Sequence, residues 1–133
     1  MEPKLEFCGN YLEICNFQHY IEDERGGNPY NCLFDIKVKS GMFSGIATGC
    51  ECDYKELQLF IKALEELISF KIKEVSFIEI GFGSKIDFIC DRTGHIKVCG
   101  KILGGFAGDH ILIFEFETDQ TVFLPFIKAL KSL

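Results

Sequence analysis

Hydrophobic and polar residues alternate along most of this chain, which is the pattern of β-strands with one buried face. The alternation is clearest where Cys32, Phe34, Ile36 and Val38 are interleaved with more polar neighbours. Residues 4–18 form either one long strand broken at Gly9-Asn10 or a tight hairpin there. Further strands are predicted at about 32–39, 43–52, 74–82, 85–91, 95–103 and 110–118.

Two segments change to the helical period of 3.6 residues. The first follows Asp53, a good N-cap residue with Glu56 three positions on, and predicts a helix over about 54–69. Its apolar stripe consists of Leu57, Phe60, Ile61, Leu64, Leu67 and Ile68. The second segment repeats that spacing and predicts a helix over about 123–132, with Pro125 tolerated in its first turn.

An exact pentapeptide repeat links the two helices, because Phe60–Leu64 and Phe126–Leu130 are both Phe-Ile-Lys-Ala-Leu. Each copy ends a run of strands, so the chain divides into two ββββα halves and suggests an internal duplication. Chance similarity is the alternative, since short hydrophobic and lysine strings recur easily. The connections between strands are too short for parallel crossovers. We therefore predict a single α+β domain over residues 1–133, with a largely antiparallel β-sheet of about eight strands and two covering helices.

The polar segment 19–30 is predicted to be a loop and is the best candidate contact surface. It contains the acidic run Glu22, Asp23 and Glu24, and Tyr30 offers an aromatic anchor for an interface. Glu115 and Glu117 alternate along a later strand and could add charge to the same contact. The plainer interpretation is a solvated loop and the wet face of a strand.

Composition narrows the classes of partner. The formal net charge of −6 and the lack of a Lys/Arg cluster disfavour nucleic-acid binding. No apolar run could span a bilayer and no signal peptide is recognisable, so we expect a cytoplasmic protein that does not bind membranes. The 7 cysteines are then expected to be reduced thiols.

No local pattern predicts catalysis, a cofactor or a metal. Cys50 and Cys52 lie on one side of a strand, but the second ligand pair of a structural zinc site is missing. His19, His95 and His110 are scattered, with no nucleophile and base in a recognisable arrangement. We therefore predict no enzymatic activity. The alternative is a small enzyme or a small-molecule-binding domain whose site is assembled only in space.

Two segments together resemble the WapI family of bacterial immunity proteins. Residues 31–45, which contain Lys-Ser-Gly-Met-Phe-Ser-Gly, resemble a strand–turn–strand of that family. Residues 114–121, with Phe-Glu-Thr-Asp-Gln-Thr followed by Leu124-Pro125, resemble its closing strand and helix. Gly94-His95-Ile96 falls where the family has a similar strand start.

The resemblance implies a cytoplasmic immunity protein that neutralises a toxin domain delivered by a neighbouring cell. Such a protein would cover the active surface of the toxin stoichiometrically and perform no chemistry itself. If the toxin were a basic nuclease, the acidic charge of this chain would speed their encounter. Glu22, Asp23, Glu24, Tyr30, Glu115 and Glu117 are the residues expected to contribute to the contact.

Overall fold

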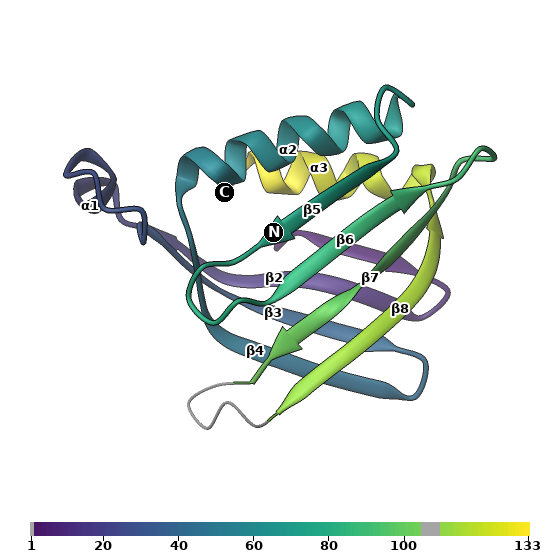
Figure 1. Cartoon of the computed structure of the whole chain (residues 1–133), viewed down its shortest axis with the longest axis horizontal. Coiled ribbons are helices and arrows are strands. Elements are labelled where there is room, and N and C mark those ends of the chain that lie inside the picture. The colour runs from purple at the N-terminus through teal and green to yellow at the C-terminus, as the bar shows by residue number, and fades with distance from the viewer. Residues whose placement is uncertain (1, 105–109) are drawn as a thin grey trace.

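The computed structural model describes residues 2–104 and 110–133, which form two four-stranded antiparallel sheets and three α-helices (Figure 1). The first sheet has the strand order β1-β2-β3-β4. Its strands are β1 (Lys4–Phe7), β2 (Asn10–His19), β3 (Cys32–Ser40) and β4 (Phe43–Cys52). The second sheet has the order β5-β6-β7-β8. Its strands are β5 (Glu74–Ile78), β6 (Lys85–Cys90), β7 (His95–Leu103) and β8 (Ile111–Asp119).

The two sheets face each other, and two helices lie side by side over the side where the sheets diverge (Figure 1). These helices are α2 (Tyr54–Ile68), which follows the first sheet, and α3 (Phe123–Lys131), which follows the second after a short 3-10 turn, η1 (Gln120–Val122). A small helix, α1 (Ile21–Arg25), projects from the connection between β2 and β3. The predicted α+β class, the antiparallel strands and both covering helices are confirmed.

The ββββα order occurs twice, as the repeated pentapeptide suggested, and the eight strands divide into two sheets at the boundary between the halves. α1 interrupts the strands of the first half only. The shared order fits an internal duplication, whose common ancestry stays a prediction.

One hydrophobic core contains side chains from both sheets and both long helices. The predicted stripe of α2 is buried at Leu57, Ile61, Leu64 and Leu67. Phenylalanines join the layers, because the Phe60 ring of α2 lies 4.9 Å from that of Phe77 in the second sheet. Aromatic rings tilted in this way stabilise one another beyond the area that they bury.

Two glycines of β4 occupy positions where a side chain would be unfavourable. Gly49 has a φ of +70°, beside a register shift of the β3–β4 pairing. This is the conformation that glycine adopts more readily than other residues, as in a β-bulge. Gly45 brings the two sheets together, since a Cβ atom there would lie 3.1 Å from Leu112.

The connections decide one pair of alternatives and correct two expectations. Of the two alternatives for residues 4–18, the structure has the hairpin, with Gly9 at a φ of +83° in its turn. Residues 19–30 are not simply a loop, because the Glu24 N–H donates to the Tyr20 carbonyl at 3.1 Å in the single turn of α1. The strand expected at 74–82 ends at Ile78. The sequence between the strands expected at 95–103 and 110–118 is rich in glycine and is predicted to be a flexible connection, and its residues 105–109 lie outside the described residues.

The early end of β5 is explained by Glu79, a fully buried carboxylate. Its two oxygens accept four backbone N–H groups, and among the described residues none of the salt bridges involves Glu79. The N–H groups of Gly81 and Phe82 donate at 2.7 and 2.8 Å, and that of Ser84 at 3.0 Å. The fourth is the N–H of Glu51 in the other sheet, at 3.0 Å. Glu79 therefore folds its own loop and joins the two halves.

We predict that Glu79→Gln lowers the free energy of unfolding by about 3 kcal/mol or more, because an amide nitrogen would then face backbone donors inside the protein. Urea unfolding followed by circular dichroism measures this change. The matched control is Glu65→Gln, which removes an exposed carboxylate 2.8 Å from Lys131 and should cost less than about 1 kcal/mol. Equal effects of the two changes would contradict the role given to Glu79.

Candidate functional site

The acidic segment lies in a lobe, residues 20–30, that projects beyond the end of the first sheet at one end of the molecule (Figure 1). The lobe contains α1 and exposes Glu22 and Asp23 to solvent. Three large apolar or aromatic side chains of the lobe, Tyr20, Ile21 and Tyr30, are 44–50% exposed. Aromatic residues are enriched in protein interfaces, so the exposed surface of the lobe is a candidate for protein binding.

Asn31 fixes the lobe to the body of the protein. This side chain is buried, and its oxygen accepts the Tyr54 N–H at 2.7 Å at the start of α2. Its amide nitrogen donates to the Asp53 carboxylate at 3.0 Å and to the Asn28 carbonyl at 2.9 Å. The expected N-cap is present too, because Asp53 accepts the Lys55 N–H at 3.1 Å. The lobe is thus tied to the N-terminus of α2.

His19 adds a second tie that the sequence did not reveal. Its Nε2 atom lies 2.8 Å from the carboxylate of Glu24, and its ring stacks on Tyr54 with centroids 4.0 Å apart. Glu24 is therefore engaged inside the lobe, and its role as a partner contact is weakened. Glu22 and Asp23 stay available, since the ion pair of Glu22 with Arg25 is fully on the surface and long, at 3.4 Å.

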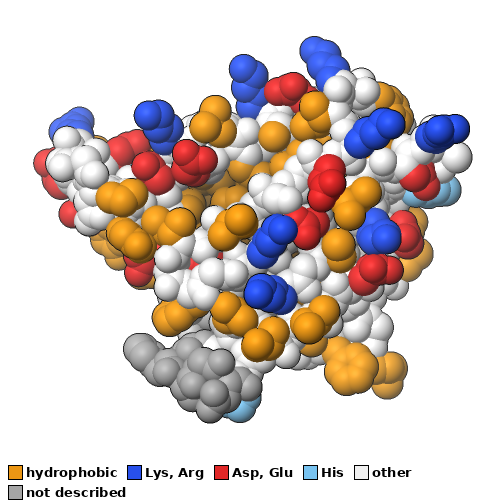
Figure 2. Space-filling view, viewed as in Figure 1, with side chains coloured by type: hydrophobic (Ala, Val, Ile, Leu, Met, Phe, Trp, Pro, Cys, Tyr) orange, Lys and Arg blue, Asp and Glu red, His pale blue; other side chains and the backbone are white. Residues whose placement is uncertain are grey.

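Glu115 and Glu117 lie elsewhere, on the outer face of β8 in the second sheet. Lysines and acidic residues are interspersed on the view of the molecule shown in Figure 2. Lys97 lies opposite Glu117 in the neighbouring strand and 3.9 Å from Glu115. The structure therefore does not bring these two glutamates to the lobe, and their charge is partly balanced locally.

The thiols that the sequence singled out are in the core. Cys50 and Cys52 are buried, and burial raises the pKa of Cys50 to about 12. Cys52 lies directly opposite Cys32 in the β3–β4 pairing. The hydrogen bond to Cys32, together with burial, raises the pKa of Cys52 as well. Protonated, buried thiols are poor nucleophiles and poor metal ligands.

Cys50 and His95, which an enzyme could use as nucleophile and base, differ in their exposure to solvent. Cys50 is inaccessible, whereas His95 is exposed at the start of β7. The Nδ1 atom of His95 lies 2.8 Å from the Thr93 hydroxyl, which also lies 2.8 Å from the Asp91 carboxylate. That carboxylate also accepts the backbone N–H groups of Thr93 and His95, an arrangement that closes the β6–β7 turn.

The cavity inside the core is small and apolar. Its volume is about 20 Å³, and its lining includes Leu12, Phe34, Phe77 and Phe126. Small-molecule pockets are commonly about 300–1,000 Å³ and carry some polar groups. This cavity therefore gives no support to small-molecule binding. Larger hollows of about 320–560 Å³ occur among the described residues, but they are open grooves on the surface.

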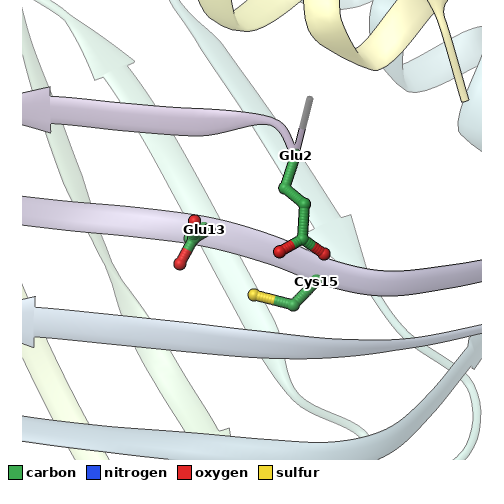
Figure 3. Close-up of side chains that lie close together, drawn as sticks. All are labelled: Glu2, Glu13 and Cys15. Carbon is green, nitrogen blue, oxygen red and sulfur yellow. The ribbon is translucent and has the colours of Figure 1, made fainter.

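One cluster that sequence spacing could not reveal joins Glu2, Glu13 and Cys15 (Figure 3). One potential ligand atom from each side chain lies within 4.8 Å of the others. Burial and both carboxylates raise the pKa of Cys15 to about 11, while Glu2 accepts the Asn16 N–H at 2.6 Å. Of the described residues, these three could offer ligands to a cation, but a protonated thiol and two partly engaged carboxylates do not identify a metal.

No family model, curated protein or solved structure matches this chain. In the described residues, no helix is both long enough and apolar enough to cross a membrane.

We predict that iodoacetamide, at about pH 8, labels the exposed Cys8 rapidly and leaves Cys50 unmodified in the folded protein. The reason is that Cys50 is both inaccessible and protonated. Peptide mapping by mass spectrometry measures the extent of labelling at each thiol. In concentrated urea both should react alike.

The raised pKa of Cys50 also predicts that the folded protein loses stability at alkaline pH. The folded protein keeps the Cys50 proton where the unfolded chain loses it, so the free energy of unfolding should fall as the pH rises from about 9 towards 12. Rapid labelling of Cys50 in the native state would contradict both expectations.

Proposed function

We propose that this chain is a cytoplasmic immunity protein that binds a bacterial toxin domain stoichiometrically and blocks its active surface. The observation that carries the proposal is the lobe, which presents Glu22 and Asp23 beside Tyr20, Ile21 and Tyr30 and is anchored by Asn31. The resemblance of residues 31–45 and 114–121 to WapI-family immunity proteins supports the same assignment.

The chemistry of the lobe suits a tight protein contact. Tyrosines bury a large area at little cost in conformational entropy and are frequent among the residues that dominate binding energy. Because Asn31 and His19 hold the lobe against α2, less ordering entropy is lost when a partner binds. A preformed surface of this kind favours a slow dissociation rate, which an inhibitor needs.

The charge of the lobe points to a basic partner. The chain as a whole carries a formal net charge of −6, and two exposed carboxylates lie at the projecting tip. Such an arrangement attracts a basic domain over a distance and speeds association at low salt. A nuclease, whose active surface is basic because it binds phosphates, is the class of toxin that best fits.

The alternative functions have weaker support in the described residues. An enzyme built on Cys50 or His95 would need them in one accessible site, but one is in the core and the other on the surface. A small-molecule-binding domain would need an enclosed site, but the cavity in the core is only about 20 Å³, and the larger hollows of about 320–560 Å³ are open grooves on the surface.

If a large secreted protein with a variable C-terminal domain is encoded directly beside this gene, the test is co-expression with that domain, scored by growth rescue and co-purification. We predict that Glu22→Lys/Asp23→Lys slows association with that domain by about tenfold at low ionic strength, because it reverses the charge at the tip. Stopped-flow measurements over a range of salt concentrations give the association rate.

The matched control is Glu115→Lys/Glu117→Lys, which changes the net charge equally but on the outer face of β8. Its effect on the association rate should be smaller than about threefold. Equal effects of the two double variants would remove the lobe from the proposal, and failure of the unchanged chain to rescue growth or to bind would overturn the proposed function itself.

A further inference from the structure

A groove between α2 and β5 follows the open edge of the second sheet. On one side it is lined by Leu59, Phe60 and Ala63 of α2, and on the other by all four residues of Val75–Ile78. Side chains of a strand alternate between its two faces, so a groove lined by consecutive residues runs along the edge of the strand. Hydrophobic side chains line the hollow beneath α2 in Figure 2, with acidic side chains toward its left-hand end.

The backbone along this edge is unpaired. Lys73 and Glu79 form hydrogen bonds with Cys90 and Ser84 on the β6 side, at 2.8 and 3.0 Å. Because antiparallel pairing alternates, the odd-numbered residues of β5 bond to β6 and the even-numbered ones point the other way. Within the described residues, β5 pairs with β6 alone, so Glu74, Ser76 and Ile78 direct N–H and C=O groups at the groove.

The end of β4 already forms one backbone hydrogen bond with the chain that continues this edge. Ile80, the next residue in the same alternation, donates its N–H to the Glu51 carbonyl at the end of β4, at 2.8 Å. The chain then leaves the edge at Asp53, where α2 begins. The pairing therefore stops after one position, and the edge beyond it keeps the geometry of a strand that lacks its neighbour.

The charges around the groove favour an incoming segment that carries positive charge. Asp53 and Glu56 are among its lining residues, and Glu74 is exposed on the strand itself. No lysine or arginine is part of the lining. Leu59 and Ile78 are 55% and 57% exposed, so apolar surface is available between the carboxylates.

We infer that the open edge of β5 is a docking site for an extended segment of a partner protein, with lysines or arginines alternating with apolar residues, which adds to the second sheet as a further antiparallel or parallel strand. The backbone of the segment bonds to Ser76 and Ile78, as in β-augmentation. Its apolar side chains contact Leu59 on the α2 side, and its basic ones approach Glu74 on the outer face of the sheet.

This partner fits better than a second copy of the chain. Two copies paired through β5 would each present the same acidic surroundings, and like charges in an interface oppose association. The inference concerns the mode of binding and holds whether or not the partner is a toxin. Its test therefore uses synthetic peptides, and its outcome is separate from that of the co-expression experiment.

The probe is a blocked hexapeptide of alternating lysine and valine, and its control is the same peptide with glutamate in place of lysine. Titration followed by ¹H–¹⁵N correlation spectra gives the affinity. We expect the lysine peptide to bind at least about tenfold more tightly than the glutamate peptide. We also expect it to slow hydrogen exchange of the Ser76 and Ile78 amides.

Two pairs of variants locate the site. Ser76→Pro removes an N–H that points away from β6, which an edge strand tolerates, whereas Ser76→Ala keeps it. Leu59→Lys adds a repelling charge to the groove, whereas Leu124→Lys makes the same change on an exposed leucine of α3. We expect Ser76→Pro and Leu59→Lys each to weaken binding of the lysine peptide about tenfold or more, and the two controls to change it less than about twofold.

Several results would overturn the inference. One is equal affinity for the two peptides, and another is no binding at millimolar concentration. A third is unchanged binding of the lysine peptide to Leu59→Lys. Because Leu59 is exposed, this variant is expected to fold normally, so it tests the groove even if Ser76→Pro does not fold. Concentration-dependent protection of Ser76 without peptide, with dimers in sedimentation experiments, would assign the edge to self-association instead.

Discussion

The buried carboxylate of Glu79 is the constraint on which the joining of the two halves depends. A charged group without a cation is expensive to bury, and here four backbone N–H groups replace its hydration. Three of them belong to its own loop and the fourth to Glu51 of the other sheet. The same contact stops β5 at Ile78 and brings Ile80 to the end of β4. The shape of the loop and the junction of the sheets thus have one cause.

The two long helices cover the side of the molecule where the sheets diverge (Figure 1). Two sheets that are joined at one end and diverge at the other expose apolar inner faces along the open side. α2 and α3 cover this side with similarly spaced apolar residues, such as Ile61 and Ile127, both of which are buried. Each half supplies one sheet and one helix, yet all four elements contribute to a single core. A half alone would leave much of its apolar surface in water, so we expect neither half to be stable by itself.

Periodicity was sufficient to predict the class of the fold, the antiparallel strands and both long helices, since these follow from local alternation and spacing. It could not show that the strands divide into two sheets, because that depends on contacts such as Gly45 with Leu112, distant in sequence. It also placed Glu79 inside a strand, because a carboxylate gives no local sign that it is buried. These are tertiary effects that override a local pattern.

The candidate site was predicted with similar limits. Loop composition marked the acidic run as the best candidate contact surface, with a solvated loop as the plainer interpretation, and exposure of Glu22 and Asp23 agrees with both. It could not foresee that His19 engages Glu24, nor that Glu115 lies on another face beside Lys97. The open edge of β5 was equally hidden, since an edge is a property of the sheet and not of the strand's own residues.

The distribution of aromatic residues also gives the protein a particular optical property. There is no tryptophan, so ultraviolet emission beyond that of phenylalanine comes from 4 tyrosines. Tyr20 and Tyr30 are on the lobe, and Tyr54 stacks on His19 at its base. Tyr11 alone lies apart, on β2 beneath Lys4. Intrinsic fluorescence of the native protein therefore reports chiefly on the surroundings of the lobe, and a partner that covers it would change that signal without any attached dye.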